Sequence, residues 1–411
     1  MLAQEHEHSG AAPATHEGHA AHAGSDLFPT SEASGTSWAP DLTPMYGRHV
    51  AAGRWELMLH GNLFVQYLNE YAPIHRGSHQ LGSINWFMVM ARRPLASGHV
   101  GLRTMLSLEP WTIRGCGYPD LLASGELCDG DGLHDQQHPH DLFMELAAEY
   151  ERPVPGGLTW HLYGGPSGEP ALGPPAFPHR ASAMPNPVAP ISHHWLDATH
   201  IAFGVVTTGV SGARWRAEVS AFNGREPDES RANLEFGALD SFSGRVTVRP
   251  RATLALQLSA GQLEAAEQDF AGGARYDVTR MTASAMYQSP NPRARLAATL
   301  AWGTNAERGQ RTHAGLAEAA LSVGERGVVF GRLELNGKPS HALHIHEQPG
   351  AVLTVAKAQA GYTRYLAPRA GLLPGVGGSV SAAIVPRSIR PNYDGVGFGI
   401  GIFATVRPAL H

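Results

Sequence analysis

The stretch "RWELMLHGNLFVQY", residues 54–67, decides the fold class. Apolar side chains occupy nearly every second position along this stretch, and mostly polar or small side chains occupy the positions between them. A repeat of two residues is that of a β-strand, because successive side chains of a strand point to opposite faces. The same alternation returns in "SFSGRVTVRPR" (241–251) and in "GVGFGIGIFATV" (395–406). The sequence therefore predicts half-exposed strands, not helices.

About sixteen such runs can be placed, and fourteen is the fallback number. Most have ~9–14 residues, which is the length that a tilted strand needs to cross a membrane. The predicted strands are 54–68, 82–95, 98–112, 141–152, 157–165, 200–210, 213–223, 240–250, 253–263, 276–288, 293–304, 314–323, 327–337, 351–365, 377–386 and 395–407.

The connections between these runs alternate in length. Those after even-numbered strands are mostly short, such as "ASG" near 97 and "GERG" near 326. Short turns at one end and long loops at the other are typical of an outer-membrane barrel. A soluble all-β fold also alternates, but it would not place Arg, Glu and Gln on its core face. We predict a closed antiparallel transmembrane β-barrel, with long loops at 69–81, 113–140, 166–199, 224–239, 264–275, 305–313 and 338–350.

Composition narrows the class of protein further. Only 16% of the 411 residues are charged, and the net charge of −5 leaves no basic footprint for nucleic acid. No apolar run approaches the ~18 residues of a membrane helix, so a helical membrane protein is excluded. The expected partners are the outer-membrane lipid bilayer and small solutes or metal ions.

Two further features flank the predicted barrel. Residues 1–45 are rich in Ala, Gly, His, Ser and Pro, so we expect a disordered periplasmic tail before a barrel at 46–411. Cys116 and Cys128 are an isolated close pair, which favours one small disulfide loop over two unrelated thiols. The histidines of the tail are His6, His8, His16, His19 and His22.

Several segments resemble an uncharacterised family of bacterial outer-membrane β-barrel proteins. The resemblance covers most of the chain and implies a barrel, without implying a particular activity. The His-rich tail is also similar in plan to outer-membrane copper-resistance proteins, although their Met-rich repeats are missing. Many such barrels end in an aromatic residue, whereas this chain ends "VRPALH". The segments are "GTSWAPDLTPM" (35–45), "LMLHGN" (57–62), "QHPHDLFMELAAEY" (137–150), "GGPSGEPALGPPAFPHR" (164–180), "HHWLDATHIAFGVVT" (193–207) and "SAFNGREPDE" (220–229).

Histidines concentrate in the predicted long loops, most densely in "HDQQHPHD" at 134–141. Imidazole is a common ligand of zinc and copper(II), and neighbouring carboxylates can bind or orient it. We expect the loops after the third and fifth strands to meet, which would bring their histidines to one ion. The alternative is that each is a polar loop residue with structural hydrogen bonds. The candidate metal ligands are His134, His138, His140, His193, His194 and His200.

Charged residues of both signs fall on the predicted inner face, which favours a passive or weakly selective channel of porin type. The competing hypothesis is a copper- or zinc-binding outer-membrane protein linked to metal resistance or uptake. We expect no enzyme, since Ser192 beside His193 lacks a recognisable nucleophile setting. The predicted pore-lining residues are Arg245, Arg249, Gln257, Arg280, Glu318, Arg332, Glu334 and Lys357.

Overall fold

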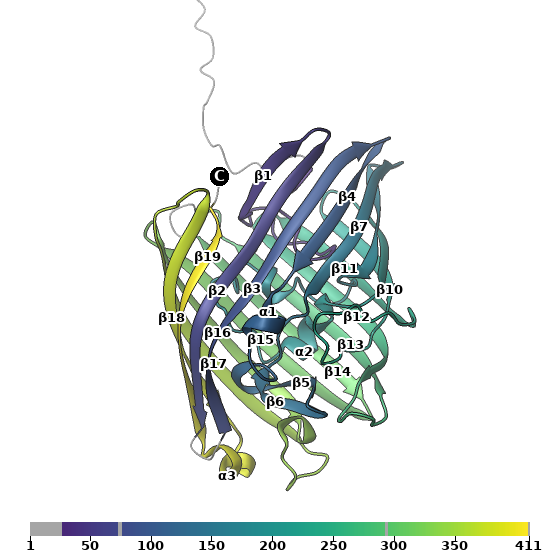
Figure 1. Ribbon diagram of the computed structural model, residues 1–411. Coiled ribbons are helices and arrows are strands. Elements are labelled where there is room, and N and C mark those ends of the chain that lie inside the picture. Colours follow the sequence, from purple (N-terminus) through teal and green to yellow (C-terminus); the bar gives the residue numbers. More distant parts are fainter. Residues whose placement is uncertain (1–26, 73–75, 292–294, 410–411) are drawn as a thin grey trace, which may run out of the picture.

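The computed structural model describes residues 27–72, 76–291 and 295–409, and Figure 1 shows that they form a closed barrel of tilted strands. Sixteen antiparallel strands pair in chain order, and β19 closes the barrel against β2. The predicted fold class and strand number are therefore confirmed. The histidines of the tail at 6–22 lie outside the described residues.

Every predicted strand has its counterpart, with changes at the ends. The barrel strands are β2 (Trp55–Ala72), β3 (Arg76–Leu95), β4 (Gly98–Leu106), β7 (Phe143–Val154), β8 (Leu158–Ser167), β9 (Val205–Ser211), β10 (Trp215–Phe222), β11 (Ser241–Arg251), β12 (Leu254–Glu267), β13 (Tyr276–Gln288), β14 (Leu296–Glu307), β15 (Gln310–Val323), β16 (Gly327–Pro339), β17 (Val352–Tyr365), β18 (Leu372–Ile384) and β19 (Val396–Pro408).

Shorter elements lie around these strands. The strand β1 (Gly47–Ala52) extends the sheet by pairing with the start of β2, and β5 (Tyr118–Cys128) forms a separate hairpin with β6 (Asp131–Gln137). The helices α1 (Glu109–Thr112), α2 (His193–Leu196) and α3 (Arg390–Tyr393) have four residues each. No helix in the described ranges has the length and hydropathy needed to cross a membrane.

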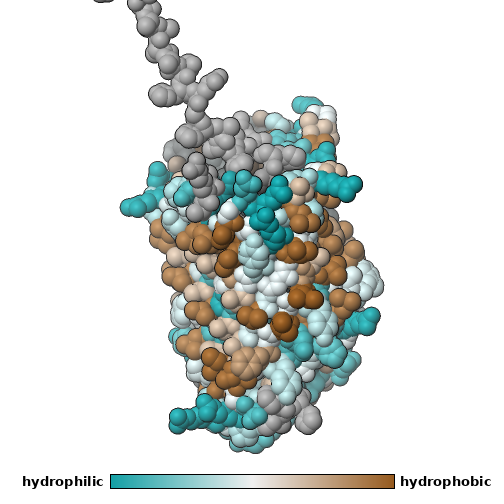
Figure 2. All heavy atoms as spheres, turned by 90° about the vertical axis from the view of Figure 1, so that its left-hand side faces the viewer, coloured by the Kyte–Doolittle hydropathy of each residue, from teal (hydrophilic) through white to brown (hydrophobic). Residues whose placement is uncertain are grey.

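The outer face of the barrel is apolar and the inner face is polar. Leu300 and Leu333 are each 62% exposed, and Ile402 is 61% exposed. Figure 2 shows hydrophobic side chains spread over the middle of one face of the wall, with hydrophilic ones towards both ends. So much exposed apolar surface belongs in lipid, and barrel closure leaves no strand edge unpaired there. The alternation in the sequence thus gives a membrane-spanning wall.

Two connections that we predicted to be long are short. The strand β14 runs to Glu307 and β15 begins at Gln310, because Arg308 and Gly309 both have positive φ and make a two-residue hairpin turn. Across the predicted loop 69–81, β2 continues to residue 72 and β3 begins at residue 76. The long connections occur elsewhere and do not all extend outward.

Three segments fold into the barrel and fill much of its lumen. They are the N-terminal plug (27–45), the first inner segment (107–142) and the second inner segment (168–204), and most of their residues are buried. The expected tail boundary at residue 45 is therefore wrong for the described part of the tail. Phe28 and Trp38 supply the apolar contacts that the low-complexity composition concealed, and both are buried.

The disulfide between Cys116 and Cys128 is present, as predicted. It closes a loop of sequence separation 12 within the first inner segment. The bond ties the start of β5 to its end, so it constrains the part of the chain that leads into "HDQQHPHD".

Candidate functional site

The second inner segment is anchored to the barrel wall by Arg180. Its guanidinium donates to Asp197 at 2.6 Å, to Glu318 of β15 at 2.6 Å and to the carbonyl of Pro175 at 3.0 Å. Although burial raises the pKa of Asp197, Arg180 and His193 hold it below its ordinary value. Charge-assisted bonds in such a dry setting are stronger than surface ion pairs. We call this group the Arg180 clamp.

The residues predicted to line the pore all have buried side chains on the inner face. Most contact an inner segment or a neighbour on the wall, not an open passage. Lys357 contacts Glu70 at 2.7 Å and Asp120 at 2.5 Å, and Glu334 accepts a hydrogen bond from the Ser192 hydroxyl at 2.6 Å. The inner segments thus cover part of this predicted lining, and neighbours on the wall pair with the rest. Further partners are Glu218 for Arg245, Asp41 for Arg249, Thr282 for Gln257, Asn305 for Arg280 and Glu318 for Arg332.

Five of the six candidate metal ligands lie together inside the barrel. The ring centroid of His138 lies 6.0 Å from the ring centroid of His193 and 5.8 Å from that of His194. That of His200 lies 5.4 Å from that of His140 and 5.2 Å from that of His193. The expected meeting of the two loops therefore occurs. Within the described residues, however, no three of these imidazoles alone offer nitrogen atoms within 4.8 Å of one another.

Each imidazole of this cluster already has a polar partner. His140 pairs with Glu109 at 2.9 Å, and His193 pairs with Asp197 at 2.8 Å. Burial lowers the pKa of His200, and neighbouring His193 and His140 lower it further. Burial likewise lowers the pKa values of His138 and His194, whereas Glu109 outweighs burial and raises the pKa of His140. Imidazole binds metal in its neutral form. The hydrogen bonds that these rings already make are, however, also what a purely structural role would require.

His134 does not belong to this cluster. Its Nδ1 lies 3.0 Å from Asp135, and its ring lies 4.3 Å from that of His344. Asp135 is drawn away from the cluster by Arg76, which donates to it at 2.7 Å. The two ends of "HDQQHPHD" therefore lie at different sites. His134 lies on the hairpin of β5 and β6 beside His344, and the end with His138 and His140 lies in the histidine cluster.

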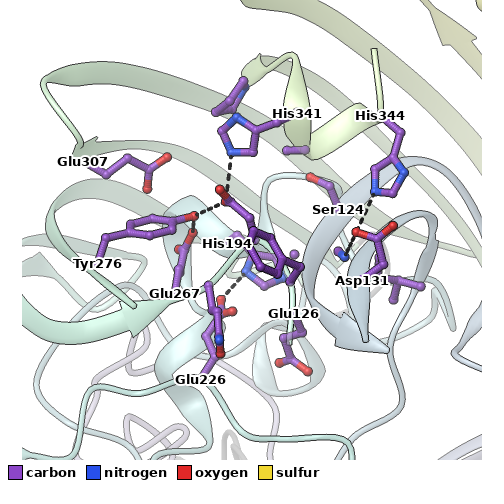
Figure 3. A pocket seen from close by; sticks show the side chains of 18 of the residues that line it. Ser124, Glu126, Asp131, His194, Glu226, Glu267, Tyr276, Glu307, His341 and His344 are labelled. Atoms are coloured by element: carbon purple, nitrogen blue, oxygen red, sulfur yellow. Dashed lines mark hydrogen bonds and ion pairs between the residues drawn. The ribbon is translucent and has the colours of Figure 1, made fainter. Parts of the chain in front are cut away.

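A cavity of about 240 Å³ opens at the end of the barrel that carries the long connections (Figure 3). Carboxylates and imidazoles dominate its lining, which contains no lysine or arginine among the described residues. Arginines outside the lining pair with Glu126, Glu267 and Asp269, so the mouth cavity offers oxygen and nitrogen ligands to a cation with only a weak negative field. Its ionisable lining is Glu126, Asp131, Glu226, Glu267, Asp269, Glu307, Tyr276, His194, His341, His344 and His346.

The tightest ligand set in the mouth cavity combines His194, Glu226 and Glu267. One ligand atom of each lies within 4.8 Å of the others, and Nδ1 of His194 lies 3.1 Å from Glu226. Burial, and after it the nearby carboxylate of Glu126, raise the pKa of Glu226 to about 8. Close approach of the ring depends on Gly125, where an added Cβ would lie 2.3 Å from the imidazole. Imidazole with carboxylates is a donor set suited to zinc or copper(II).

Sequence reasoning missed Glu267 and Arg180. Glu267 lies beyond the predicted end of its strand, because β12 continues past a register irregularity between Leu263 and Glu267. A bulge changes which face the following side chains occupy, and period-two alternation does not detect it. Arg180 ends the quoted motif "PAFPHR" but carries no signal of its partners, which are 17 and 138 residues away.

Ser192 and His193 do not form a nucleophile pair. The Ser192 hydroxyl donates to Glu334, and the ring of His193 is oriented by Asp197. The two side chains thus serve different anchoring contacts.

No family model and no curated protein sequence matches the chain. Solved structures do match its fold. A high-pH structure of Pseudomonas putida OprB has 9% identity and a TM-score of 0.52, over 86% of this chain and 94% of that one. Salmonella typhi OmpF, solved in complex with daunomycin, has 10% identity and a TM-score of 0.51, over 87% of this chain and 100% of that one. At these identities the likeness concerns the fold, which is that of an outer-membrane barrel.

Proposed function

We propose that the protein is an outer-membrane channel of porin type that passes small solutes through a constricted lumen. The observation that carries the proposal is a closed barrel with an apolar outer belt and an inner face of ionisable side chains. In the proposed orientation both termini and the short turns face the periplasm. A polar interior is typical of outer-membrane barrels of this size, including those that form channels.

The inner segments set the size and charge preference of the proposed passage. Because wall charges are paired with these segments, they add little net field along the lumen. The described lining of the mouth cavity has carboxylates and imidazoles but no lysine or arginine, and arginines behind it pair with some of the carboxylates, so small cations should be only weakly preferred over anions. The proposed channel is therefore narrow and weakly cation-selective.

Single-channel recording in planar bilayers tests this proposal. The wild-type protein should conduct in small steps, and Arg180→Gln should conduct in larger steps because it loosens the second inner segment from β15. Arg214→Gln is the matched control, since Arg214 is exposed at a short turn and its side chain bonds only the nearby Pro250 carbonyl in the described structure. Folded protein that conducts in neither form would show that the barrel is closed.

A second candidate function is divalent metal binding, and the set of His194, Glu226 and Glu267 favours it. Zinc or copper(II) would bind there between the inner segment and the wall. Calorimetric titration should show a tight site in the full chain that Glu226→Gln together with Glu267→Gln removes. The variant Glu325→Gln, in an exposed turn, should keep the tight site. Metal binding by the tail histidines is the same in the wild type and in both variants, so it does not affect the comparison. A titration that these substitutions leave unchanged would exclude the site.

A further inference from the structure

Seven of the ten methionines gather at one place inside the barrel, near the end with the short turns. A polar lumen should contain few apolar side chains, so this concentration departs from the rest of the inner face. Part of it is explained by packing, because Phe28 of the N-terminal plug and Phe203 lie in the same cluster. The methionines are Met45, Met58, Met88, Met90, Met105, Met144 and Met184.

Strand register brings several of these thioethers and one imidazole side by side. On β2 and β3, Met58 is opposite Met90 and His60 is opposite Met88. On β3 and β4, Met88 is opposite Met105. Opposite residues have Cβ atoms about 4.5–5.5 Å apart, so these side chains form one compact group on the inner face.

The second inner segment adds an imidazole to this group. Nε2 of His179 lies 3.3 Å from Sδ of Met105, and its ring lies 5.8 Å from that of His60. His179 is only 9% exposed, so it is buried with a weak sulfur acceptor as the one partner of its ring nitrogens in the described structure. Two ligands bound to one ion at about 2.0–2.3 Å are themselves about 3–4 Å apart. The observed spacing is that of neighbouring ligands.

A cavity of about 40 Å³ adjoins these side chains and is lined by five of the methionines and both imidazoles. One ion or water needs only about 10–15 Å³. The one carboxylate in its lining, Glu32, is paired with Arg92 at 2.7 Å. Arg407 and Arg103 also act electrostatically on the two imidazoles. Neutral ligands beside cationic side chains disfavour a divalent ion and tolerate a monovalent one.

We propose that Met58, Met88, Met90, Met105, His60 and His179 form a binding site for a soft monovalent metal ion, copper(I). Thioether sulfur selects soft ions, whereas zinc and magnesium prefer other donors. Three or four of the six groups suffice for such an ion. The proposal rests neither on conduction nor on the divalent site at the mouth, which has different ligands.

X-ray absorption of the full-length protein loaded with copper(I) under ascorbate tests the donor type. Both cysteines are in the disulfide, so sulfur scattering from copper has to come from methionine. We expect copper–sulfur scattering from at least two thioethers. A spectrum that fits nitrogen and oxygen alone, as for binding to tail histidines, would overturn the proposal.

Titration with silver(I), which needs no reductant, tests the location. Met88→Leu combined with Met105→Leu conserves side-chain volume and should retain the fold, but should weaken the tightest silver(I) binding at least tenfold. Met286→Leu is the matched control, because Met286 is buried on the inner face of β13, outside this group. Unchanged affinity in the double variant would mean that the methionines only pack against the plug. Should the double variant misfold, the wild-type absorption spectrum still decides.

Discussion

Asp197→Asn should open the second inner segment without unfolding the barrel. The substitution keeps the shape of the side chain and removes its charge. Asp197 then loses its charge-assisted bond with Arg180, while Arg180 keeps Glu318 at 2.6 Å and His193 keeps an acceptor. Because the pKa of Asp197 lies below its ordinary value, the wild-type carboxylate stabilises the fold throughout neutral pH, and that contribution is lost only as pH falls through the depressed folded-state pKa.

The magnitude follows from what remains bonded. Hydrogen bonds to charged groups contribute about 1.5–3 kcal/mol, and removing one partner of a buried ion pair costs about 3–5 kcal/mol when the other charge is left alone. Since Glu318 still compensates Arg180, the lower range applies, and we expect about 2 kcal/mol. Each 1.4 kcal/mol is tenfold, so the open population of the segment should rise about 30-fold.

The chain offers a direct assay, because Lys338 and Lys357 are its only lysines. Nζ of Lys338 donates to Ser124 at 2.8 Å and lies 4.9 Å from the ring centroid of Trp195, in the second inner segment. Lys357 is held instead by Glu70 and Asp120. Acetylation with a water-soluble amine reagent, read by mass spectrometry, should become about 30-fold faster at Lys338 in the variant. Lys357 is the internal reference.

Two results would refute this reasoning. Unchanged acetylation of Lys338 would show that Arg180 and Asp197 do not hold the segment closed. Equal acceleration at Lys338 and Lys357 would show loss of the whole lumen filling. Glu325→Gln, in the exposed turn between β15 and β16, should leave both rates at their wild-type values.

Three further predictions concern pH, the disulfide and the lipid face. Burial raises the pKa of Glu226 to about 8, so its contribution to stability is full below about pH 4.5 and is lost as pH rises through about 8. In urea unfolding followed by tryptophan fluorescence, Glu226→Gln should be more stable than wild type at pH 9, by up to about 5 kcal/mol for the full shift, and equal at pH 4, and equal stability at both would contradict the raised pKa. Replacing Cys116 and Cys128 by Ser should cost about 3 kcal/mol of local stability, seen as faster proteolysis within residues 107–142, whereas an unaltered cleavage rate would show that the hairpin holds itself. Leu333→Arg, on the exposed face of β16, should destabilise the barrel in lipid vesicles by about 2–4 kcal/mol, while Leu366→Arg in the turn after β17 should cost less than about 1 kcal/mol, and equal costs would place both outside the apolar belt.

The wall of the barrel could be predicted because its physics is local. An outward side chain meets lipid and an inward one meets polar groups, so each strand carries the period-two pattern in its own residues. Turns also carry a local signal, because positive φ favours particular residues. Gly309 after Arg308 could have revealed the two-residue turn that we predicted as a loop. Strand ends at bulges, such as the one before Glu267, leave no comparable signal.

The lumen could be predicted only in part, because its contacts join distant parts of the chain. Histidine density placed His138 and His193 in one cluster, since their loops follow nearby strands. The direction of a loop depends on partners such as Glu318, which is 138 residues from Arg180. Composition suggested that residues before 46 are disordered, yet Phe28 and Trp38, together with ion pairs such as that of Glu32 with Arg92, hold the described part of that segment against the wall. A few apolar anchors outweigh a biased composition.

The second inner segment contributes a ligand to each proposed metal site, His179 near the short turns and His194 at the mouth. The Arg180 clamp lies on the same segment, at the residue next to His179 and 14 positions before His194. An ion that binds either imidazole in the closed arrangement must stabilise that arrangement, and the linkage is reciprocal. In the proposed channel, larger conductance needs the opposite displacement of this segment. The channel and metal-binding proposals are therefore opposed through one structural element, and occupancy of either site should reduce conductance instead of accompanying it.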